Sequence, residues 1–188
     1  MQMSSKIFFV SSNKNKFEEA KTILLKFGIT LEFQKAQLQE IQANNLDEIA
    51  KHKAIQAFSI CSKPVIVEDD GLFINSLMGF PGPYSSFVYE TIGNKGILRL
   101  VSTPRDAKFR SIIAFCESEN KVHSFSAEVK GKISKKELGK RWGFDPIFIP
   151  IGRIQSYSQI TEKNEISHRY LALKKFATWY LHRKKSKD

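Results

Sequence analysis

The sequence predicts an α/β protein in which helices flank a mixed β-sheet. In the first half of the chain, short apolar runs alternate with segments whose apolar residues recur at helical spacing. In the second half, two longer segments of alternating apolar and polar residues flank a short polar turn, which is typical of a β-hairpin. The chain has 188 residues, 41% of them apolar, so it can bury a core without disulfides or a structural metal. We find no internal repeat and no low-complexity linker, and we therefore expect one domain.

The first half of the chain is expected to begin with a strand over residues 7–10 and a helix that ends at Gly28. A weaker strand over residues 31–37 follows. A second helix starts after an acidic pair, which suits the positive end of a helix dipole, and a buried strand over residues 65–67 comes next. The buried faces of the two helices are marked by Phe17, Ala20, Leu24 and Phe27 in the first and by Ala50, Ala54, Ala57, Phe58 and Cys61 in the second.

The middle of the chain is expected to hold a loop, a third helix and the hairpin. Glycine and proline are frequent in residues 71–84, which predicts the loop, and the helix is expected over residues 86–101. Residues 109–116 and 122–133 are predicted to form the two paired strands of the hairpin.

The end of the chain is expected to add one short strand and one long helix. A polar loop over residues 135–146 leads into the strand, residues 147–149. The helix is predicted to begin at Ser167, a residue type that caps helix N-termini. Its buried face is marked by Leu173, Phe176, Ala177 and Tyr180.

The charge and the cysteines restrict the class of protein. The formal net charge is +11, and residues 182–188 form a basic tail. A basic protein favours an anionic partner, which could be nucleic acid, an acidic lipid surface or a phosphorylated small molecule. Cys61 and Cys116 lie far apart, which indicates buried thiols in a reducing compartment rather than a zinc site. Because the apolar runs are too short for a membrane span and the N-terminal residues lack a secretory signal, we expect a cytoplasmic protein.

The first candidate for binding chemistry is the polar segment between the first strand and the first helix. It consists of Ser11, Ser12, Asn13, Lys14, Asn15 and Lys16. Free amide groups at a helix start, the helix dipole, hydroxyl groups and lysines together suit a phosphate group. Taken alone, the segment is better explained by an ordinary asparagine cap followed by solvated lysines, because such caps are common.

The second candidate is the acidic run Glu68-Asp69-Asp70, which directly follows the predicted strand over residues 65–67. Three neighbouring carboxylates repel one another, a cost that is understandable if a divalent cation with a preference for oxygen ligands, such as Mg²⁺, lies among them. Glu40, after the second strand, is a further candidate ligand. The alternative is an acidic turn.

The third candidate combines a glycine-containing aromatic loop with a cationic segment near the last helix. Exposed aromatic rings offer a surface on which a nucleobase can stack, and cationic side chains donate hydrogen bonds to keto or phosphate oxygens. The alternative is an aromatic residue folded into the core beside a charged helix start. The residues are Trp142, Gly143, Phe144 and Asp145 in the loop and Lys163, His168 and Arg169 near the helix. The three candidates together indicate a nucleoside triphosphate site.

Five motifs occur in the order and spacing of one known family. They are Ser11-Ser12-Asn13-x-x-Lys16, Glu68-Asp69-Asp70-Gly71-Leu72, Pro81-Gly82-Pro83-Tyr84, Gly143-Phe144-Asp145-Pro146 and Ser167-His168-Arg169. Over residues 7–181 the chain resembles the inosine/xanthosine triphosphate pyrophosphatases. The resemblance implies a Mg²⁺-dependent enzyme that hydrolyses ITP, dITP and XTP to the monophosphate and pyrophosphate. It also implies an elongated mixed β-sheet with two lobes and a cleft between them, and a homodimer.

The resemblance also implies roles for individual residues. Residues 11–16 would hold the triphosphate, Glu40 and Asp69 the metal, and Asp69 would also act as general base. In the mechanism that we expect, Glu68 joins Asp69 as a catalytic residue by helping Glu40 to place the metal, and Lys16 joins them by holding the phosphates with Lys53. Lys53, Asp70 and Ser86 would be further substrate contacts, and the base site would consist of Trp142, Gly143, Phe144, Asp145, Lys163, His168 and Arg169.

Two positions depart from the family pattern. Ser12 stands where the family usually has glycine, which matters if the turn needs a positive φ, and Ser86 stands where some members carry lysine. We expect one two-lobed domain over residues 1–181, followed by the tail 182–188. If Arg169 contacts the base, neutralising it should lower ITP turnover more than it lowers stability.

Two other functions compete with this one. A nucleic-acid-binding module would account for the net charge, the tail and the loop aromatics, but it would leave the acidic run unexplained, since carboxylates repel phosphates. A related pyrophosphatase for modified pyrimidines or methylated nucleotides would share the architecture, and the His168-Arg169 pair favours deaminated purines over it. We therefore expect a small-molecule substrate, with no specific nucleic acid and no membrane as partner.

Overall fold

The computed structural model describes residues 6–119 and 121–185. Its elements are β1 (Ile7–Ser11), α1 (Lys14–Leu25), β2 (Leu31–Lys35), α2 (Leu46–Cys61), β3 (Val65–Ile74), η1 (Asn75–Leu77), β4 (Pro81–Gly82), α3 (Ser85–Thr91), α4 (Gly93–Leu100), β5 (Asp106–Ser118), β6 (Lys121–Ile133), β7 (Phe148–Pro150), α5 (Lys163–Ile166) and α6 (His168–Lys185). Among these described residues, no helix is long and apolar enough to cross a membrane.

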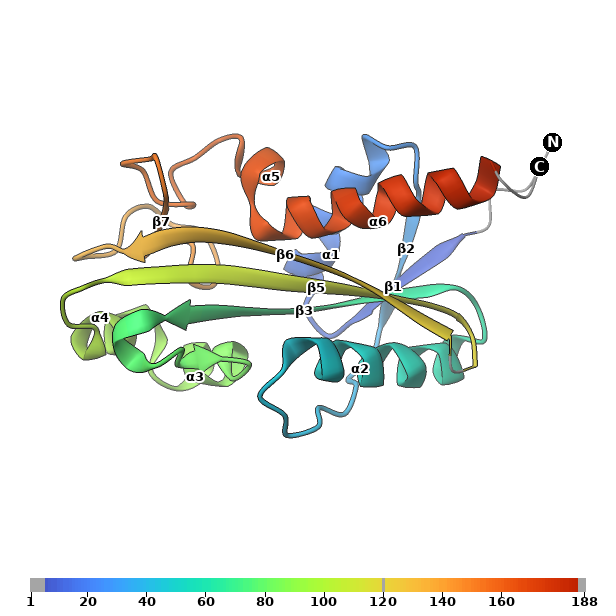
Figure 1. The fold of residues 1–188 in the computed structure, drawn as a ribbon, viewed down its shortest axis with the longest axis horizontal. Helices are drawn as coiled ribbons and strands as arrows, with labels where there is room; N and C mark the ends of the chain where they lie inside the picture. Colours follow the sequence, from blue (N-terminus) through green and yellow to red (C-terminus); the bar gives the residue numbers. More distant parts are fainter. Residues whose placement is uncertain (1–5, 120, 186–188) are drawn as a thin grey trace.

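The sheet is mixed, as the sequence predicts. Its strand order is β2-β1-β3-β5-β6-β7, and the short β4 pairs with β3 outside this path. β1 is parallel to both β2 and β3, whereas the pairs β3–β5, β5–β6 and β6–β7 are antiparallel. The long strands β3, β5 and β6 extend along the molecule and give it an elongated shape (Figure 1).

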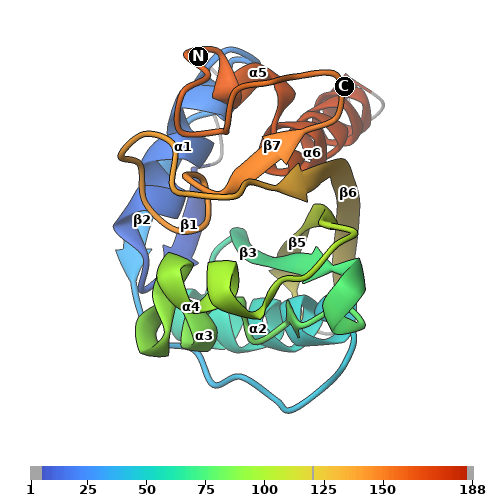
Figure 2. The same cartoon turned by 90° about the vertical axis from the view of Figure 1, so that its left-hand side faces the viewer.

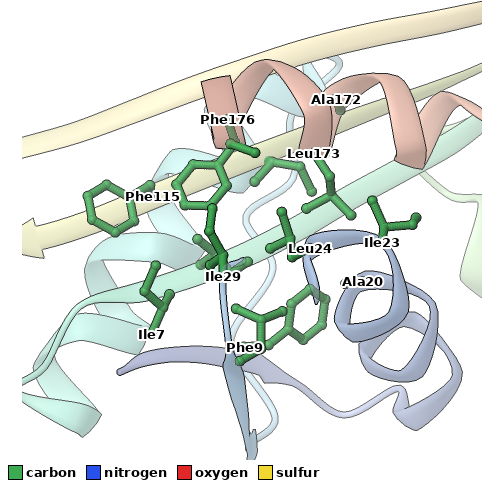
Figure 3. Packing of buried hydrophobic residues seen from close by; sticks show 14 of the residues in the cluster. Ile7, Phe9, Ala20, Ile23, Leu24, Ile29, Phe115, Ala172, Leu173 and Phe176 are labelled. Carbon is green, nitrogen blue, oxygen red and sulfur yellow. The ribbon is translucent and has the colours of Figure 1, made fainter. Parts of the chain in front are cut away.

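Helices cover the two faces of this sheet and form two lobes around the shared long strands. In the first lobe α1 and α6 pack on one face, where residues such as Phe9, Phe115 and Phe176 form one cluster (Figure 3). α2 packs on the other face against a second cluster. In the second lobe, α3, α4 and the segment around Phe144 and Tyr157 enclose a third cluster. Figure 2 shows the sheet from its β7 end, with α3 and α4 below it.

The largest difference from the sequence prediction concerns the loop expected over residues 71–84. β3 continues to Ile74 and pairs with β5 over all ten of its residues, so the acidic run lies within a strand rather than after one. A methyl group at Gly71 would overlap the carbonyl oxygen of Gly82 on β4. Gly71 is therefore required by the close approach of two backbones. The frequent glycine and proline residues of 71–84 had suggested a loop instead.

We expect Gly71→Ala to lower the free energy of unfolding by about 3 kcal/mol, because the added methyl must push β4 away from β3. Gly28→Ala is the matched comparison, since Gly28 has a positive φ but open space around it. This second variant should cost about 1 kcal/mol from backbone strain alone. Urea denaturation of both variants measures the difference, and equal losses would contradict the steric explanation.

Other boundaries also shift. The helix expected over residues 86–101 is two helices, α3 and α4, because the chain turns at Gly93 with φ of +59°. The hairpin strands are longer than predicted, and the one-turn helix α5 was not expected. Ser167 does cap α6, as predicted, with its hydroxyl accepting a hydrogen bond from the Tyr170 amide at 3.1 Å.

α6 extends into the segment that the sequence assigns to a basic tail. Residues 182–185 belong to the helix, whereas residues 186–188 lie outside the described residues. Arg183 pairs with Glu117, and its guanidinium lies 5.2 Å from the centre of the Trp179 ring. Part of the basic segment is thus attached to the sheet.

Candidate active site

A cleft of about 740 Å³ opens between the two lobes. It is lined by the β1–α1 junction, the middle of β3, the helix α3, the loop around Gly143 and the start of α6. The predicted site residues that line it are Ser11, Ser12, Asn13, Asn15, Lys16, Glu40, Lys53, Glu68, Asp69, Asp70, Ser86, Trp142, Gly143, Phe144, Asp145, Lys163, His168 and Arg169. Lys14 is the exception, because it is exposed and does not line the cleft. For this lysine the alternative of a solvated side chain holds.

The β1–α1 junction is built as a helix cap. Asn13 Oδ1 accepts hydrogen bonds from the amides of Asn15 and Lys16 at 3.0 and 3.3 Å, and Ser11 Oγ accepts from the Asn13 amide at 3.0 Å. The only non-glycine residues with positive φ in the described part of the chain are elsewhere, so Ser12 needs no glycine-like backbone. The replacement of the usual glycine by serine is therefore compatible with this turn.

The acidic run on β3 is divided between the two faces of the sheet. Because side chains alternate along a strand, Asp69 points to the α2 face while Glu68 and Asp70 point to the α6 face. β1 pairs with β3 only at Val65 and Ile66, which leaves the next part of this β3 edge open toward the cleft. Neighbouring carboxylates thus acquire different partners and different roles.

Asp69 is a buried carboxylate that lacks a full set of partners. Lys53 Nζ lies 3.1 Å from Asp69 Oδ2, yet this ion pair does not have hydrogen-bond angles, and Oδ2 accepts no hydrogen bond from the described residues. Lys53 instead donates to Glu40 Oε1 at 2.5 Å. Burial raises the pKa of Asp69 to about 6, against the opposing effect of Lys53 and Lys16. Asp69 can therefore take up a proton near neutral pH.

Glu68 has a complete set of partners and no free oxygen. Arg169 Nε donates to Oε1 and Oε2 of Glu68 at 2.9 and 2.7 Å, and Ser111 Oγ donates to Oε1 at 2.8 Å. The Glu68 side chain is fully buried. We had expected Glu68 to assist the metal and the catalytic base, but its oxygens are used to hold Arg169.

Arg169 joins three carboxylates in the interior. Besides Glu68, its Nη2 donates to Asp70 Oδ2 at 3.0 Å, and its Nη1 pairs with Glu19. The side chain is 1% exposed, and although burial opposes its charge, the three acids hold the pKa of Arg169 well above its usual value. Asp70 in turn pairs with Lys16, and despite burial its pKa lies well below the ordinary range.

Glu19 is the central residue that the sequence analysis missed. Its Oε1 accepts hydrogen bonds from Trp142 Nε1 at 3.0 Å and from Lys163 Nζ at 2.9 Å. Burial raises its pKa, but Arg169 and Lys163 outweigh this and lower the pKa to about 2. Glu19 follows Lys16 by three residues and so lies on the same helix face. That spacing was the available signal.

The end of the cleft expected to bind the base is more enclosed than predicted. Phe144 is buried and packs edge-to-face on Tyr89, with 5.4 Å between ring centres, so it is not an exposed stacking surface. Trp142 is half-buried, with Arg169 5.2 Å and Lys163 5.3 Å from its ring centre. Lys163 also donates to Asp145 Oδ2 at 2.6 Å.

His168 is a buried residue in this region with unused hydrogen-bonding atoms. Its ring stacks on Phe109 at 4.4 Å between ring centres. Neither ring nitrogen has a hydrogen-bond partner among the described residues, although Nε2 lies 3.7 Å from Asp70 Oδ2. Burial lowers the pKa of His168, against the raising effect of Asp70. A neutral imidazole of this kind can either donate to or accept from a ligand.

A family model described as the Ham1 family matches residues 7–179. The chain belongs to the Ham1 family. Curated relatives named dITP/XTP pyrophosphatase include one from Methanopyrus kandleri, 43% identical over 93% of this chain and 96% of the relative. Another, from Methanothermobacter marburgensis, is 46% identical over the same shares of the two chains.

Solved structures of the Ham1 family share this fold. A HAM1 protein from Coxiella burnetii superposes with a TM-score of 0.80 at 26% identity, covering 95% of this chain and 99% of the other. The Ham1 protein of Staphylococcus aureus gives a TM-score of 0.78 at 23% identity. The predicted fold class, an elongated mixed sheet with flanking helices in two lobes, is confirmed by these neighbours and by the topology above.

Proposed function

We propose that this Ham1-family protein hydrolyses the deaminated purine nucleotides ITP, dITP and XTP to the monophosphate and pyrophosphate. The observation that carries the proposal is Asp69 Oδ2, which accepts no hydrogen bond from the described residues although it is buried at the cleft and Lys53 lies beside it. Its pKa of about 6 suits a general base at neutral pH. The dITP/XTP pyrophosphatases among its relatives support the same reaction.

We further propose that Mg²⁺ is the cofactor, held by Glu40 and Asp69. No group of three metal-binding side chains is preassembled in the described residues, so the protein alone offers an incomplete site. Two carboxylates fit Mg²⁺ nevertheless, because this ion keeps several waters and is usually completed by substrate phosphates. Asp69 Oδ2 has a free acceptor position, and the Glu40 side chain is 60% exposed in the cleft. When bound, the ion would neutralise charge on the phosphates.

Side chains and backbone amides of the protein would activate the attacking water and hold the phosphates. Asp69 would position the attacking water and accept its proton as the water oxygen bonds to the α-phosphorus and the bond to the leaving pyrophosphate breaks. Lys16, Lys53 and the amide groups at the start of α1 would hold the phosphates, since phosphoryl transfer depends mainly on alignment and charge neutralisation. Ser86 lines the same cleft from α3 and would be a neutral phosphate contact.

The other end of the cleft would select the base. Hypoxanthine and xanthine carry a 6-keto acceptor where adenine carries an amino donor. A ring nitrogen of buried His168 that carries its proton toward the base can donate to such an acceptor. The amino group of adenine would face this N–H with a second donor, and both donors would stay unpaired. Lys163 and Arg169 are already bonded to carboxylates, so in this structure they shape the pocket around Trp142.

We also propose that the protein is a cytoplasmic homodimer with one domain over residues 1–181. The resemblance to the family supports the dimer, and the exposed apolar side chains on and before α3, among them Phe80, Tyr84 and Phe87, are available for contacts. Light scattering after gel filtration would measure the mass. A single-chain mass of 21.5 kDa at micromolar concentration would contradict the dimer.

We expect Mg²⁺-dependent release of pyrophosphate from ITP, dITP and XTP, and at least about tenfold lower kcat/KM for ATP and dUTP, the range that one or two unpaired buried polar groups produce. The measurement compares pyrophosphate and orthophosphate release with Mg²⁺ and with a chelator. Preference for dUTP would favour the pyrimidine-specific alternative. Release of orthophosphate, or no reaction, would contradict the proposed function.

A further inference from the structure

One hydrogen bond joins the helix α4 to the loop of Trp142, Gly143, Phe144 and Asp145, which we call the base loop. Asn94 Nδ2 donates to the carbonyl oxygen of Gly143 at 3.1 Å. Asn94 lies on the first turn of α4, and 49 residues separate it from Gly143. Asn94 is itself absent from the cleft lining, so it stands behind the base loop rather than in contact with a ligand.

The Gly143 carbonyl depends on this bond for its orientation. Gly143 has φ of +65°, a conformation that glycine adopts readily, and an added Cβ would meet nothing within 4 Å. Among the described residues, Asn94 is the one hydrogen-bond donor to this carbonyl. The peptide between Gly143 and Phe144 could turn over if the bond were lost, since glycine tolerates many backbone conformations.

The residues on either side of Gly143 form the wall of the cleft. Trp142 is tied to α1 through its hydrogen bond to Glu19, and Phe144 packs edge-to-face on Tyr89 of α3. The base loop is therefore attached to α1 at one end and to the α3–α4 unit at the other. A rotation of the Gly143 peptide would move both rings relative to each other.

One atom of the buried Asn94 side chain destabilises the fold. Its side chain is buried, with 9% of the residue exposed, and its Oδ1 has no hydrogen-bond partner. An unpaired buried acceptor destabilises a protein, so an apolar side chain would be more favourable here for folding alone. The donor Nδ2 is the feature of Asn94 that such a replacement would lose.

We propose that Asn94 is a positioning residue that fixes the base loop through the Gly143 carbonyl and thereby sets the affinity for the nucleobase. The inference rests on the proposed function for its kinetic consequence, but the geometry of the base loop can be tested without it. Loss of the donor should weaken binding of the base while leaving the chemical step at Asp69, which lies on β3 and not in the base loop, largely unaffected.

The experiment compares Asn94→Ala and Asn94→Asp with the wild-type chain. Asp has the shape of Asn and favours a helix N-terminus, but its carboxylate cannot donate to the carbonyl. Ile97→Val is the matched control, because Ile97 is buried on α4 and the change loosens the helix without removing the hydrogen bond. KM and kcat for ITP, and inhibition by IMP, are measured for each protein.

Both Asn94 variants should raise the KM for ITP and the inhibition constant of IMP by roughly three- to tenfold, the range expected for one hydrogen bond. Their kcat should change by less than about twofold, as for lost ground-state binding. Ile97→Val should lower Tm but leave KM unchanged. Unchanged KM and IMP inhibition in the Asn94 variants, or a fall in kcat alone, would overturn the proposal.

A spectroscopic measurement separates this inference from the proposed function. With Trp179 replaced by Phe, the emission of the folded, ligand-free protein reports on Trp142. Asn94→Ala should shift this emission and increase its quenching by acrylamide, whereas Ile97→Val should not. If wild-type protein did not hydrolyse ITP, the proposed function would fail while this comparison still tested the base loop. Identical emission in all variants would overturn the inference.

Discussion

Asp69→Asn should lower ITP turnover by about 10²–10⁴-fold, the contribution of a positioned general base, while making the metal-free protein more stable at neutral and alkaline pH. The two effects have one cause. Burial raises the pKa of Asp69 from 3.8 to about 6, which means that the fold opposes the charge that the reaction needs. Asparagine has nearly the same shape but carries no charge to desolvate, and it cannot accept the proton.

The sign of the stability change follows from the two pKa values. Below pH 3.8 Asp69 is protonated in both the folded and the unfolded chain, and no charge is buried. As the pH rises from 3.8 through about 6, ionisation of Asp69 becomes more costly in the folded chain than in the unfolded chain. The free energy of unfolding of the wild-type protein therefore falls over this range. At about pH 8 Asp69→Asn should therefore be more stable than wild type by about 1–3 kcal/mol. The difference should shrink toward zero near about pH 4.

The lysines around Asp69 do not cancel this gain. After the substitution Lys53 keeps its hydrogen bond to Glu40, and Lys16 keeps its ion pair with Asp70. Glu68→Gln is the matched comparison, because Glu68 is the adjacent carboxylate but is fully paired with Arg169. It should lower stability at the same pH. Thermal denaturation in the presence of a chelator, together with ITP turnover in Mg²⁺, measures both effects.

Two outcomes would contradict this account of Asp69. Near-normal turnover of Asp69→Asn would show that another group accepts the proton. A large loss of stability at alkaline pH would show that the charged form of Asp69 is favoured by the fold.

The sequence was sufficient to predict the fold class because the local residue patterns mark the same faces that pack on the sheet in the structure. The alternating residues of β6 and the helical spacing in α1 and α6 mark faces that are buried in the structure. Gly71 misled the prediction because its role depends on β4, a partner that sequence distance does not reveal. Gly93 likewise divided one predicted helix into α3 and α4.

For the candidate site, the sequence likewise predicted which residues belong to it but not which of them pair with one another. Residue types and spacing were enough to gather the acids of β3, the lysines and the aromatic loop in one group. They could not show which acid pairs with which cation. Glu68 and Asp69 are neighbours in the sequence, yet the pleat of β3 directs one to Arg169 and the other to Lys53. Glu19 was missed because its partners are more than a hundred residues away.

Arg169→Met should unfold the protein more easily, lowering its free energy of unfolding by about 3–5 kcal/mol, the usual cost of leaving buried charges without a partner. Its guanidinium bonds to Glu68, Asp70 and Glu19 through different nitrogens. Lysine cannot replace this, since a single ammonium does not reach three carboxylates with the same geometry. This expectation differs from the one based on sequence, in which Arg169 mainly contacts the base.

An exposed arginine provides the control. Arg153 pairs with Glu162 at 3.3 Å, and both side chains are nearly half exposed. Arg153→Met should change stability by less than about 1 kcal/mol, as is usual for surface ion pairs. Urea denaturation at neutral pH measures the two variants and the wild type under identical conditions.

Stability at low pH provides a second, independent test of the ion pairs around Arg169. Because the pKa of Glu19 is lowered from 4.5 to about 2 by Arg169 and Lys163, its contribution to stability is present above pH 4.5 and is lost as the pH falls through about 2. Without Arg169 this contribution shrinks, so Arg169→Met should lose less stability over that range than wild type does. If Arg169→Met instead had wild-type stability at every pH but failed to turn over ITP, the arginine would be a substrate contact. Its three carboxylates would then have to find other partners. Among the described residues Asp70 also pairs with Lys16 and Glu19 with Lys163, whereas Glu68 has an ion pair with Arg169 alone.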